Sequence, residues 1–187
     1  MCGIIAYAGN KPAANVVLEG LKKLEYRGYD SWGIVALADS AENPGGVFSA
    51  FSVIKKVGKI GEINWDYVSK AIRVENHIAA GHTRWSTHGG VTEQNAHPHL
   101  DCSGKIAVVH NGIVDNHQQI RAGLGSHKFL SQTDTEVIPH MIEEIMAREG
   151  LDFVAAVRKA ANTLKGRSAF VAINSETGQV AAARKGT

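Results

Sequence analysis

The order of apolar segments constrains the fold of this chain more than any other feature. A strand pattern at 2–8 is followed by a helix that opens at Pro12 and ends near Gly28. Two further strand patterns, at 32–38 and 47–57, then follow each other directly. Strict alternation of strands and helices would predict a parallel sheet, whereas strands adjacent in sequence favour antiparallel sheets covered by helices. The order therefore predicts an α+β fold.

The second half of the chain fits the same class. Pro139 lies early in a helical pattern, so that helix must begin close to the proline or bend there. Residues 32–57 would form one hairpin, and the chain stops directly after its last strand, which indicates a piece of a larger protein. A short helix, two strands, two longer helices and a final hairpin are expected over 65–74, 78–82, 106–110, 137–145, 153–164, 169–174 and 179–183.

Composition limits the classes of function. The 187 residues suffice for one domain, and a net charge of +2 is too small to favour nucleic acid or an acidic membrane as partner. Two cysteines, Cys2 and Cys102, do not make a disulfide framework, which fits a reducing compartment. Neither a signal sequence nor an apolar run of about 20 residues is present. A cytoplasmic protein is therefore expected.

Cys2 follows the initiator methionine, and its small side chain permits removal of Met1 by an aminopeptidase. Removal would leave a thiol and a free α-amine on one residue. The thiol is a nucleophile with an ordinary pKa of about 8.5, and the amine, with an ordinary pKa of about 7.7–8.0, is a partly neutral base. A catalytic Cys2 would combine both roles, as N-terminal threonine enzymes do, although a cysteine at this position is usually accidental.

Two polar segments could bind a charged ligand. Arg84, in the Gly/Thr/His-rich loop at 81–90, could hold a carboxylate through its guanidinium fork, with Thr87 completing the site. Gly28, at a helix end, could simply be a helix C-cap among solvated charges. The segment 133–136 could cap the following helix, or offer a carboxylate to a ligand ammonium; both can hold at once.

The pair Asn111-Gly112 closes an apolar strand. The asparagine amide and the glycine backbone N–H could form a two-donor oxyanion hole, although Asn-Gly is also the commonest hairpin turn. Taken alone, the turn is the simpler interpretation.

The histidines of the polar loop suggest metal ligands, since His-x-His can supply two ligands on one strand. Against this, no carboxylate or second cysteine lies at a recognisable ligand spacing. We therefore expect a hydrogen-bonding scaffold and no metal or other cofactor. The histidines in question are His82, His88, His97, His99 and His110.

Together these segments resemble the glutaminase domain of class II glutamine amidotransferases, a branch of the N-terminal nucleophile hydrolases. Tyr26, Tyr29 and Trp85 favour the sugar-amidating branch, glutamine:fructose-6-phosphate amidotransferase, over amidophosphoribosyltransferases and asparagine synthetases. The matching motifs are Met-Cys-Gly-Ile at 1–4, Leu-Glu-Tyr-Arg-Gly-Tyr-Asp-Ser at 24–31, Gly-His-Thr-Arg-Trp-Ser-Thr-His-Gly at 81–89, Asn-Ala-His-Pro-His at 95–99, His-Asn-Gly-Ile-Val-Asp-Asn at 110–116 and Thr-Asp-Thr-Glu at 133–136.

The resemblance implies a four-layer αββα sandwich of two mostly antiparallel sheets between helix layers, here lacking its last strands. Residues 1–187 would be a truncated glutaminase domain, with the sugar isomerase domains absent. L-Glutamine would be the substrate. The full-length enzyme, a homodimer, would pass the ammonia to fructose 6-phosphate bound by its isomerase domains. No nucleic acid or membrane partner is implied.

The resemblance also implies roles for individual residues. Cys2 would attack the glutamine side-chain amide, and Asn111 and Gly112 would hold the oxyanion, while His97 would be a scaffold residue. The substrate-binding set would be Arg84, Thr87 and His88 at the α-carboxylate, Asp134 at the α-ammonium, Trp85 at the ammonia exit, and Arg27 and Gly28 around the nucleophile.

Three alternatives remain open. The chain could be the glutaminase domain of another class II amidotransferase, such as an amidophosphoribosyltransferase. It could be a module that binds glutamine without hydrolysing it. A zinc hydrolase built on the histidines is the third, and ammonia release measured with and without a chelator separates it from the others.

Overall fold

The computed structural model describes residues 2–39, 48–62, 68, 72, 76–86 and 89–186. The expected helix over 65–74 lies largely outside these residues, as does the turn that joins the two strands of 32–57. The strands on either side of that turn are described, and they pair antiparallel as expected.

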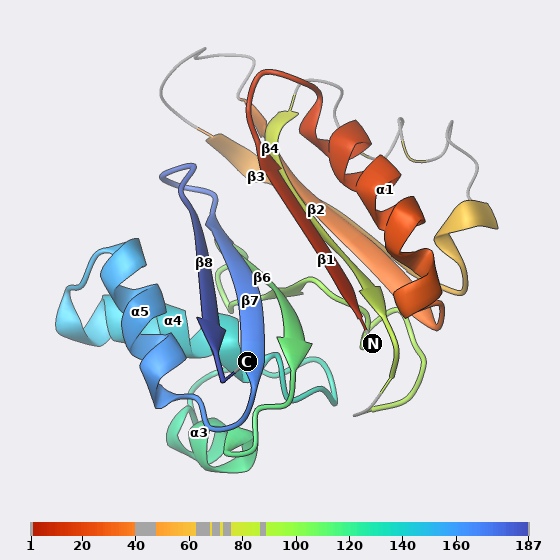
Figure 1. Ribbon diagram of the computed structural model, residues 1–187. Coiled ribbons are helices and arrows are strands. Elements are labelled where there is room, and N and C mark those ends of the chain that lie inside the picture. Colours follow the sequence, from red (N-terminus) through yellow and green to blue (C-terminus); the bar gives the residue numbers. More distant parts are fainter. Residues whose placement is uncertain are drawn as a thin grey trace.

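The described strands form two four-stranded antiparallel sheets (Figure 1). The first has the order β1-β4-β2-β3, and the second the order β5-β6-β7-β8. The strands are β1 (Gly3–Ala8), β2 (Ser31–Asp39), β3 (Phe48–Val57), β4 (Asn76–Arg84), β5 (His99–Leu100), β6 (Ile106–Gly112), β7 (Ser168–Asn174) and β8 (Val180–Lys185).

Helices lie on the outer faces of the two sheets, as Figure 1 shows. Helix α1 covers the first sheet, while α4 and α5 pack on the second. Among the described helices, none combines the length and the apolar character that crossing a bilayer requires. The helical segments are α1 (Ala13–Leu24), α3 (His117–Gly123), α4 (Val137–Glu149), α5 (Phe153–Thr163), and the 3₁₀ turns Glu25–Arg27 and Ile60–Glu62.

Strand β2 shows why the first sheet is buried on both faces. Ile34 and Ala36 pack against α1, whereas Val35 and Leu37 belong to the cluster between the two sheets. Side chains of a strand alternate between its faces, so a continuous apolar run supplies both cores at once. The run at 32–38 therefore codes for a strand between two apolar layers.

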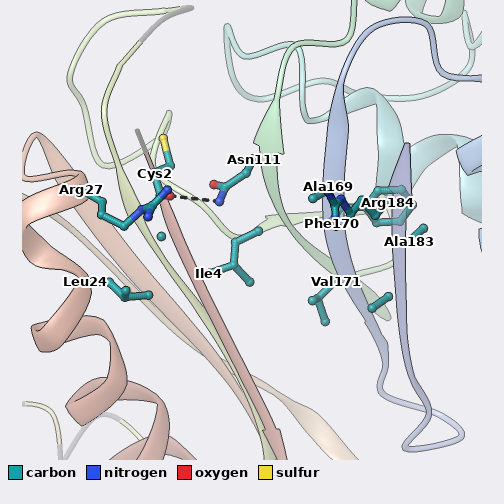
Figure 2. A pocket seen from close by; sticks show the side chains of 12 residues that line it. Cys2, Ile4, Leu24, Arg27, Asn111, Ala169, Phe170, Val171, Ala183 and Arg184 are labelled. Atoms are coloured by element: carbon teal, nitrogen blue, oxygen red, sulfur yellow. Dashed lines mark hydrogen bonds between the residues drawn. The ribbon is translucent and has the colours of Figure 1, made fainter. Parts of the chain in front are cut away.

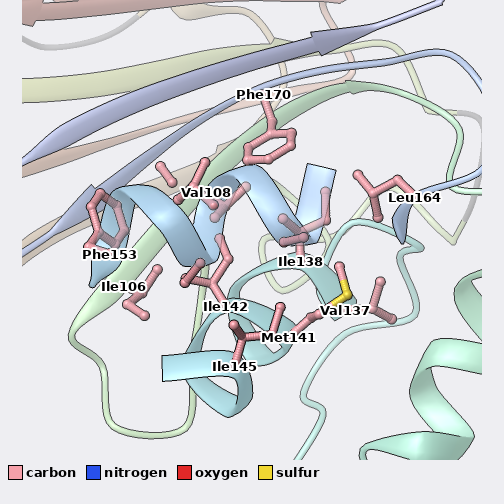
Figure 3. Packing of buried hydrophobic residues seen from close by; sticks show 14 of the residues in the cluster. Ile106, Val108, Val137, Ile138, Met141, Ile142, Ile145, Phe153, Leu164 and Phe170 are labelled. Atoms are coloured by element: carbon pink, nitrogen blue, oxygen red, sulfur yellow. The ribbon is translucent and has the colours of Figure 1, made fainter. Parts of the chain in front are cut away.

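Strand β6 plays the same part in the second sheet. Ile106 and Val108 pack on the helical side, where Figure 3 shows them beside side chains of α4 and α5. Ala107 and Val109 face the first sheet. The layers are therefore helix, sheet, sheet and helix, and the expected αββα sandwich is confirmed.

Local signals set the ends of the last helices. Pro139 is the third residue of α4, in the first turn, where a backbone N–H has no partner within the helix. Gly150 ends α4 with φ +66°, and Asp152 caps α5 by accepting a hydrogen bond from Ala155 N–H at 2.8 Å. The sequence did not predict α3 or β5, which are short and lack a clear apolar period.

Candidate active site

Cys2 lies at the end of the first sheet where β1 begins and β4 ends. It precedes β1, whose Gly3 pairs with Thr83 of β4, so the thiol comes beside the residue that follows β4. Trp85 N–H donates to the Cys2 Sγ at 3.2 Å, and the thiol lies 3.5 Å from the Trp85 carbonyl oxygen. These two contacts hold the sulfur beside the backbone of Trp85.

Asn111, on β6 of the second sheet, makes a hydrogen bond to Cys2. Its Nδ2 donates to the Cys2 carbonyl oxygen at 3.1 Å, the dashed line of Figure 2. Its Oδ1 lies 2.8 Å from Nε2 of His82, which is fully buried. Burial lowers the pKa of His82 to about 3, so the ring is neutral and donates a proton to Oδ1. That donation orients the amide with its N–H groups toward Cys2.

Gly112 follows Asn111 inside β6 and pairs with Ser168 of β7. The interpretation of Asn-Gly as a hairpin turn is therefore wrong. Gly112 has φ +134°, and a Cβ there would come within 2.1 Å of the Arg167 carbonyl oxygen. Only glycine tolerates both conditions. The strand thus ends with a backbone N–H at a position that no side chain crowds.

Arg84, the last residue of β4, is 4% exposed. Its Nη1 donates to the Gly90 carbonyl oxygen at 3.3 Å. Burial lowers the pKa of the guanidinium, while the negative charges of Cys2, Asp134 and Asp30 oppose that effect. Arg84 therefore stays a cation and stands among anionic partners.

Asp134 enters the site from the segment that precedes α4. It is 5% exposed, and its Oδ2 accepts a hydrogen bond from Val114 N–H at 2.7 Å. Thr135 is likewise engaged, with Oγ1 2.8 Å from Nδ1 of His110. The residue at the N-cap is Glu136, and no side chain caps the helix, so the capping interpretation of this segment is wrong.

A small cavity of about 30 Å³ joins these residues. The nucleophile, a cation and an anion therefore share one cavity, although they come from opposite ends of the sequence. Among the lining residues are Cys2, Arg84, Trp85, Gly112 and Asp134.

Arg27 and Gly28 lie on the other side of the thiol. Arg27 lines a larger pocket of about 460 Å³ that also contains Cys2 and Asn111 (Figure 2). Gly28 packs against the end of β4, where an added Cβ would come 2.8 Å from the Arg84 carbonyl carbon. Its φ of −171° is ordinary extended backbone, so it caps the 3₁₀ turn without a left-handed conformation.

Two expected substrate-binding residues, Thr87 and His88, lie outside the described residues. Trp85 is 46% exposed, and its ring centroid lies 5.4 Å from that of Tyr29. The indole therefore stands at the surface beside the thiol, on a second aromatic ring.

Two supporting residues were not assigned a role from the sequence. His82 orients Asn111, as described above. Asn95 joins two edges of the site: its Nδ2 donates to the Gly90 carbonyl oxygen at 3.0 Å, and its Oδ1 accepts from Gln132 N–H at 2.9 Å. The motif at 95–99 was the available signal. Nδ1 of His97 accepts a hydrogen bond from His110 N–H at 3.3 Å, and the ring centroids of His97 and His82 lie 4.2 Å apart. These contacts are those expected of a scaffold residue.

Two antiparallel sheets between helix layers, with a cysteine beside the first strand and an Asn-Gly pair facing it, define the class of N-terminal nucleophile amidotransferases. The chain belongs to the glutamine amidotransferase family, because the family model described as "Glutamine amidotransferase domain" matches residues 82–186. This confirms the resemblance that the motifs indicate.

Curated relatives agree with that assignment. A glutamine–fructose-6-phosphate aminotransferase (isomerizing) of Streptococcus pneumoniae strain R6 is 41% identical over 96% of this chain and 28% of its own length. The protein of the same name from Pyrococcus horikoshii is 46% identical over 92% of this chain and 27% of its own length. The chain therefore spans little more than a quarter of these relatives.

A solved structure supports the fold alone. The glutamine phosphoribosylpyrophosphate amidotransferase of B. subtilis, in complex with ADP and GMP, is 24% identical. It matches 94% of this chain and 35% of its own chain with a TM-score of 0.71.

Proposed function

We propose that this domain hydrolyses the side-chain amide of L-glutamine to glutamate and ammonia through a γ-glutamyl thioester on Cys2. The observation that carries the proposal is the shared cavity of Cys2, Arg84 and Asp134, with Asn111 at hydrogen-bonding distance from Cys2. Glutamine has a carboxylate, an ammonium and an amide. The cavity offers a cation, an anion and a nucleophile for them.

The reaction begins once Met1 has been removed. The sulfur of Cys2 attacks the amide carbon, and the thiol proton passes through the Cys2 α-amine to the leaving nitrogen, which departs as ammonia. The oxyanion that forms between these events accepts hydrogen bonds from Asn111 Nδ2 and Gly112 N–H. Water, deprotonated by the same amine, then attacks the thioester and releases glutamate and the free thiol.

The remaining residues hold the substrate. Arg84 binds the α-carboxylate, with Thr87 and His88 as further donors. Asp134 binds the α-ammonium through Oδ1; among the residues that the structure describes, no hydrogen bond engages that oxygen. Trp85 shields the departing ammonia, while Arg27 and Gly28 shape the surroundings of the thiol. The carboxylate and the ammonium of the substrate thereby each meet a fixed partner of opposite charge.

In the longer protein we propose that the ammonia passes to fructose 6-phosphate bound by sugar isomerase domains, in a cytoplasmic homodimer that makes glucosamine 6-phosphate. The names of the relatives support this acceptor. A phosphoribosyl acceptor is the alternative, and it predicts ammonia transfer to phosphoribosylpyrophosphate when the complete protein is supplied with both acceptors.

The glutaminase step is tested by ammonia release from glutamine, on protein whose N-terminus mass spectrometry has verified as Cys2. Cys2→Ala should lower the rate by at least about 10⁴-fold while glutamine still binds, because the nucleophile alone is lost. Cys102→Ala is the matched control and should stay within about twofold. Full activity of Cys2→Ala would refute the mechanism.

Hydroxylamine separates the remaining alternatives. A thioester on Cys2 should react with it to give γ-glutamyl hydroxamate, which a non-catalytic glutamine-binding module cannot form. A zinc hydrolase that uses an activated water would form no hydroxamate, and removal of its zinc by brief chelation would stop the reaction. Hydroxamate formed by the Cys2→Ala variant would also overturn the thioester.

A further inference from the structure

Four metal-ligating side chains converge outside the cavity of the proposed reaction. They are Cys102, His127, His140 and Glu143, here called the Cys102 cluster. Cys102 lies in the turn between β5 and β6, His127 in the loop between α3 and α4, and the other two on α4, one helical turn apart. One ligand atom from each residue lies within 4.8 Å of every other. None of the four lines the cavity of Cys2, Arg84 and Asp134.

Four of the distances between these atoms lie close to the edges of a coordination tetrahedron. With Zn–S of about 2.3 Å and Zn–N or Zn–O of about 2.1 Å, tetrahedral angles place S and N about 3.6 Å apart, and N and O about 3.4 Å apart. The Cys102 Sγ lies 3.5 Å from Nδ1 of both histidines. The Glu143 Oε2 lies 3.2 Å from Nδ1 of His127 and 3.7 Å from Nδ1 of His140.

The second ring nitrogens of the two histidines differ in their contacts with carboxylates. Nε2 of His127 lies 3.1 Å from Glu144 Oε2, within hydrogen-bonding distance, whereas Nε2 of His140 lies 3.8 Å from Glu136 Oε1 and has no hydrogen-bond partner among the residues that the structure describes. The Glu144 carboxylate at Nε2 of His127 turns Nδ1 of that ring toward the cluster, as a carboxylate does for histidines that bind metals. The four atoms that face one another are a sulfur, two ring nitrogens and a carboxylate oxygen, each of a type that binds metals.

Backbone contacts place the other two ligands. Lys128 N–H donates to the Cys102 sulfur at 3.3 Å, and Cys102 N–H donates to Glu143 Oε2 at 3.0 Å. Both contacts fix the positions of these two ligand atoms. When bound to a divalent cation, a thiolate and a carboxylate would together balance its charge. A pocket of about 480 Å³, lined in part by Cys102 and His140, gives the cation a route in.

We propose that the Cys102 cluster is a structural site for a divalent transition-metal ion of the zinc type. Thiolate and imidazole ligands suit Zn²⁺, whereas Mg²⁺ and Ca²⁺ require oxygen ligands. Four protein ligands close the coordination shell, so the ion has no open position for a substrate. It ties the β5–β6 turn and the α3–α4 loop to α4.

The proposal does not depend on the glutaminase reaction, because it can be tested by metal binding in a variant without the nucleophile. Cys2→Ala protein, freed of metal, should bind one equivalent of Co²⁺ and gain a sulfur-to-cobalt charge-transfer band in the near ultraviolet. Zn²⁺ should displace the Co²⁺ with a Kd below about 10⁻⁷ M. The double variant Cys2→Ala/Cys102→Ala should lose the band.

Wild-type protein and Cys2→Ala should show equal bands. A band that disappears with Cys2 instead of Cys102 would place the metal at the N-terminus and overturn the proposal, as would binding of less than half an equivalent. Zn²⁺ should also raise the Tm of Cys2→Ala but not of the double variant.

Glu144→Gln tests the geometry without removing a ligand. The charge-transfer band should persist, because the thiolate remains, while the affinity for Zn²⁺ falls about 10–100-fold. An unchanged affinity would contradict the role given to the His127–Glu144 contact. The exposed variant Glu149→Gln, on the same helix, is the control and should leave the affinity unchanged.

Discussion

Cys2 and Cys102 both lie near histidines, but these histidines face different partners. Near Cys2, His82 bonds to the Asn111 amide, and His110 to the Thr135 hydroxyl. In the Cys102 cluster, both histidines face carboxylates. Burial keeps the rings of His82 and His110 uncharged, whereas the sulfur and carboxylate beside His127 and His140 are ligands for a metal cation. The groups opposite a histidine decide its chemistry more than the number of histidines does.

If catalysis belongs to the Cys2 region alone, the largest contrast should come from the oxyanion donor. Asn111→Ala should lower kcat for glutamine about 10²–10³-fold, because one of two hydrogen bonds to the oxyanion is lost. His127→Ala, in the Cys102 cluster, should change kcat by less than about twofold at a temperature where both variants are folded. Similar losses in both would erase the distinction between the regions.

A smaller effect should follow from the substrate clamp. Arg84→Lys replaces a planar fork with a point charge, so KM for glutamine should rise about 10–100-fold with kcat nearly preserved. Arg148→Ala, which removes an exposed arginine from α4, is the control and should leave KM unchanged. Initial rates over a range of glutamine concentrations decide the matter, and an unaltered KM for Arg84→Lys would remove the carboxylate role.

The role of His82 as a positioning residue predicts a smaller effect still. His82→Leu should lower kcat about tenfold without raising KM, since Asn111 loses the donor that orients its amide. His82→Gln, which keeps an N–H donor, should recover part of the loss. Thermal melts establish that both variants fold. If leucine and glutamine act alike, the hydrogen bond has no part in catalysis.

The buried histidines also predict how stability depends on pH. Burial lowers the pKa of His82 to about 3 and of His110 to about 4, both below the ordinary value of 6.5. Between pH 6.5 and 4 the unfolded chain therefore binds more protons than the folded one, so this stability is present above pH 6.5 and lost as the pH falls. The urea midpoint should be lower at about pH 5 than at about pH 7.

A chelator should be present in both solutions. Zinc binding also weakens at low pH, because the metal ligands become protonated. Removing the zinc therefore isolates the contribution of the Cys2 region. A midpoint that is equal or higher at the lower pH would contradict the neutral state of these rings.

Apolar runs and their order predicted the long strands and antiparallel sheets covered by helices, whereas the αββα layering was implied by the resemblance to the family. The apolar pattern could not predict α3, of which no residue is buried, or β5, which has two residues. The local turn preference of one dipeptide also gave a wrong prediction. Asn111-Gly112 favours a turn by itself, but pairing with β7 keeps it in a strand.

The set of motifs, through its resemblance to the family, indicated Cys2, Arg84 and Asn111, and the structure brings these three residues together. The supporting contacts were not predictable, because they join distant segments. Asn95, for example, links Gly90 to Gln132. The Cys102 cluster was missed for the same reason: its ligands come from three segments without a recognisable spacing, and only the packing of α4 brings them together.

The alternation of side chains along β6 determines both the packing of two hydrophobic cores and the position of the Asn111 amide. The alternation that sends Ile106 and Val108 to the helices and Ala107 and Val109 to the other sheet also fixes the side on which Asn111 emerges. One residue inserted anywhere between Ile106 and Asn111 would invert every side chain beyond it and carry the amide away from Cys2. Natural variants should therefore change length in the loops around β6, never within it.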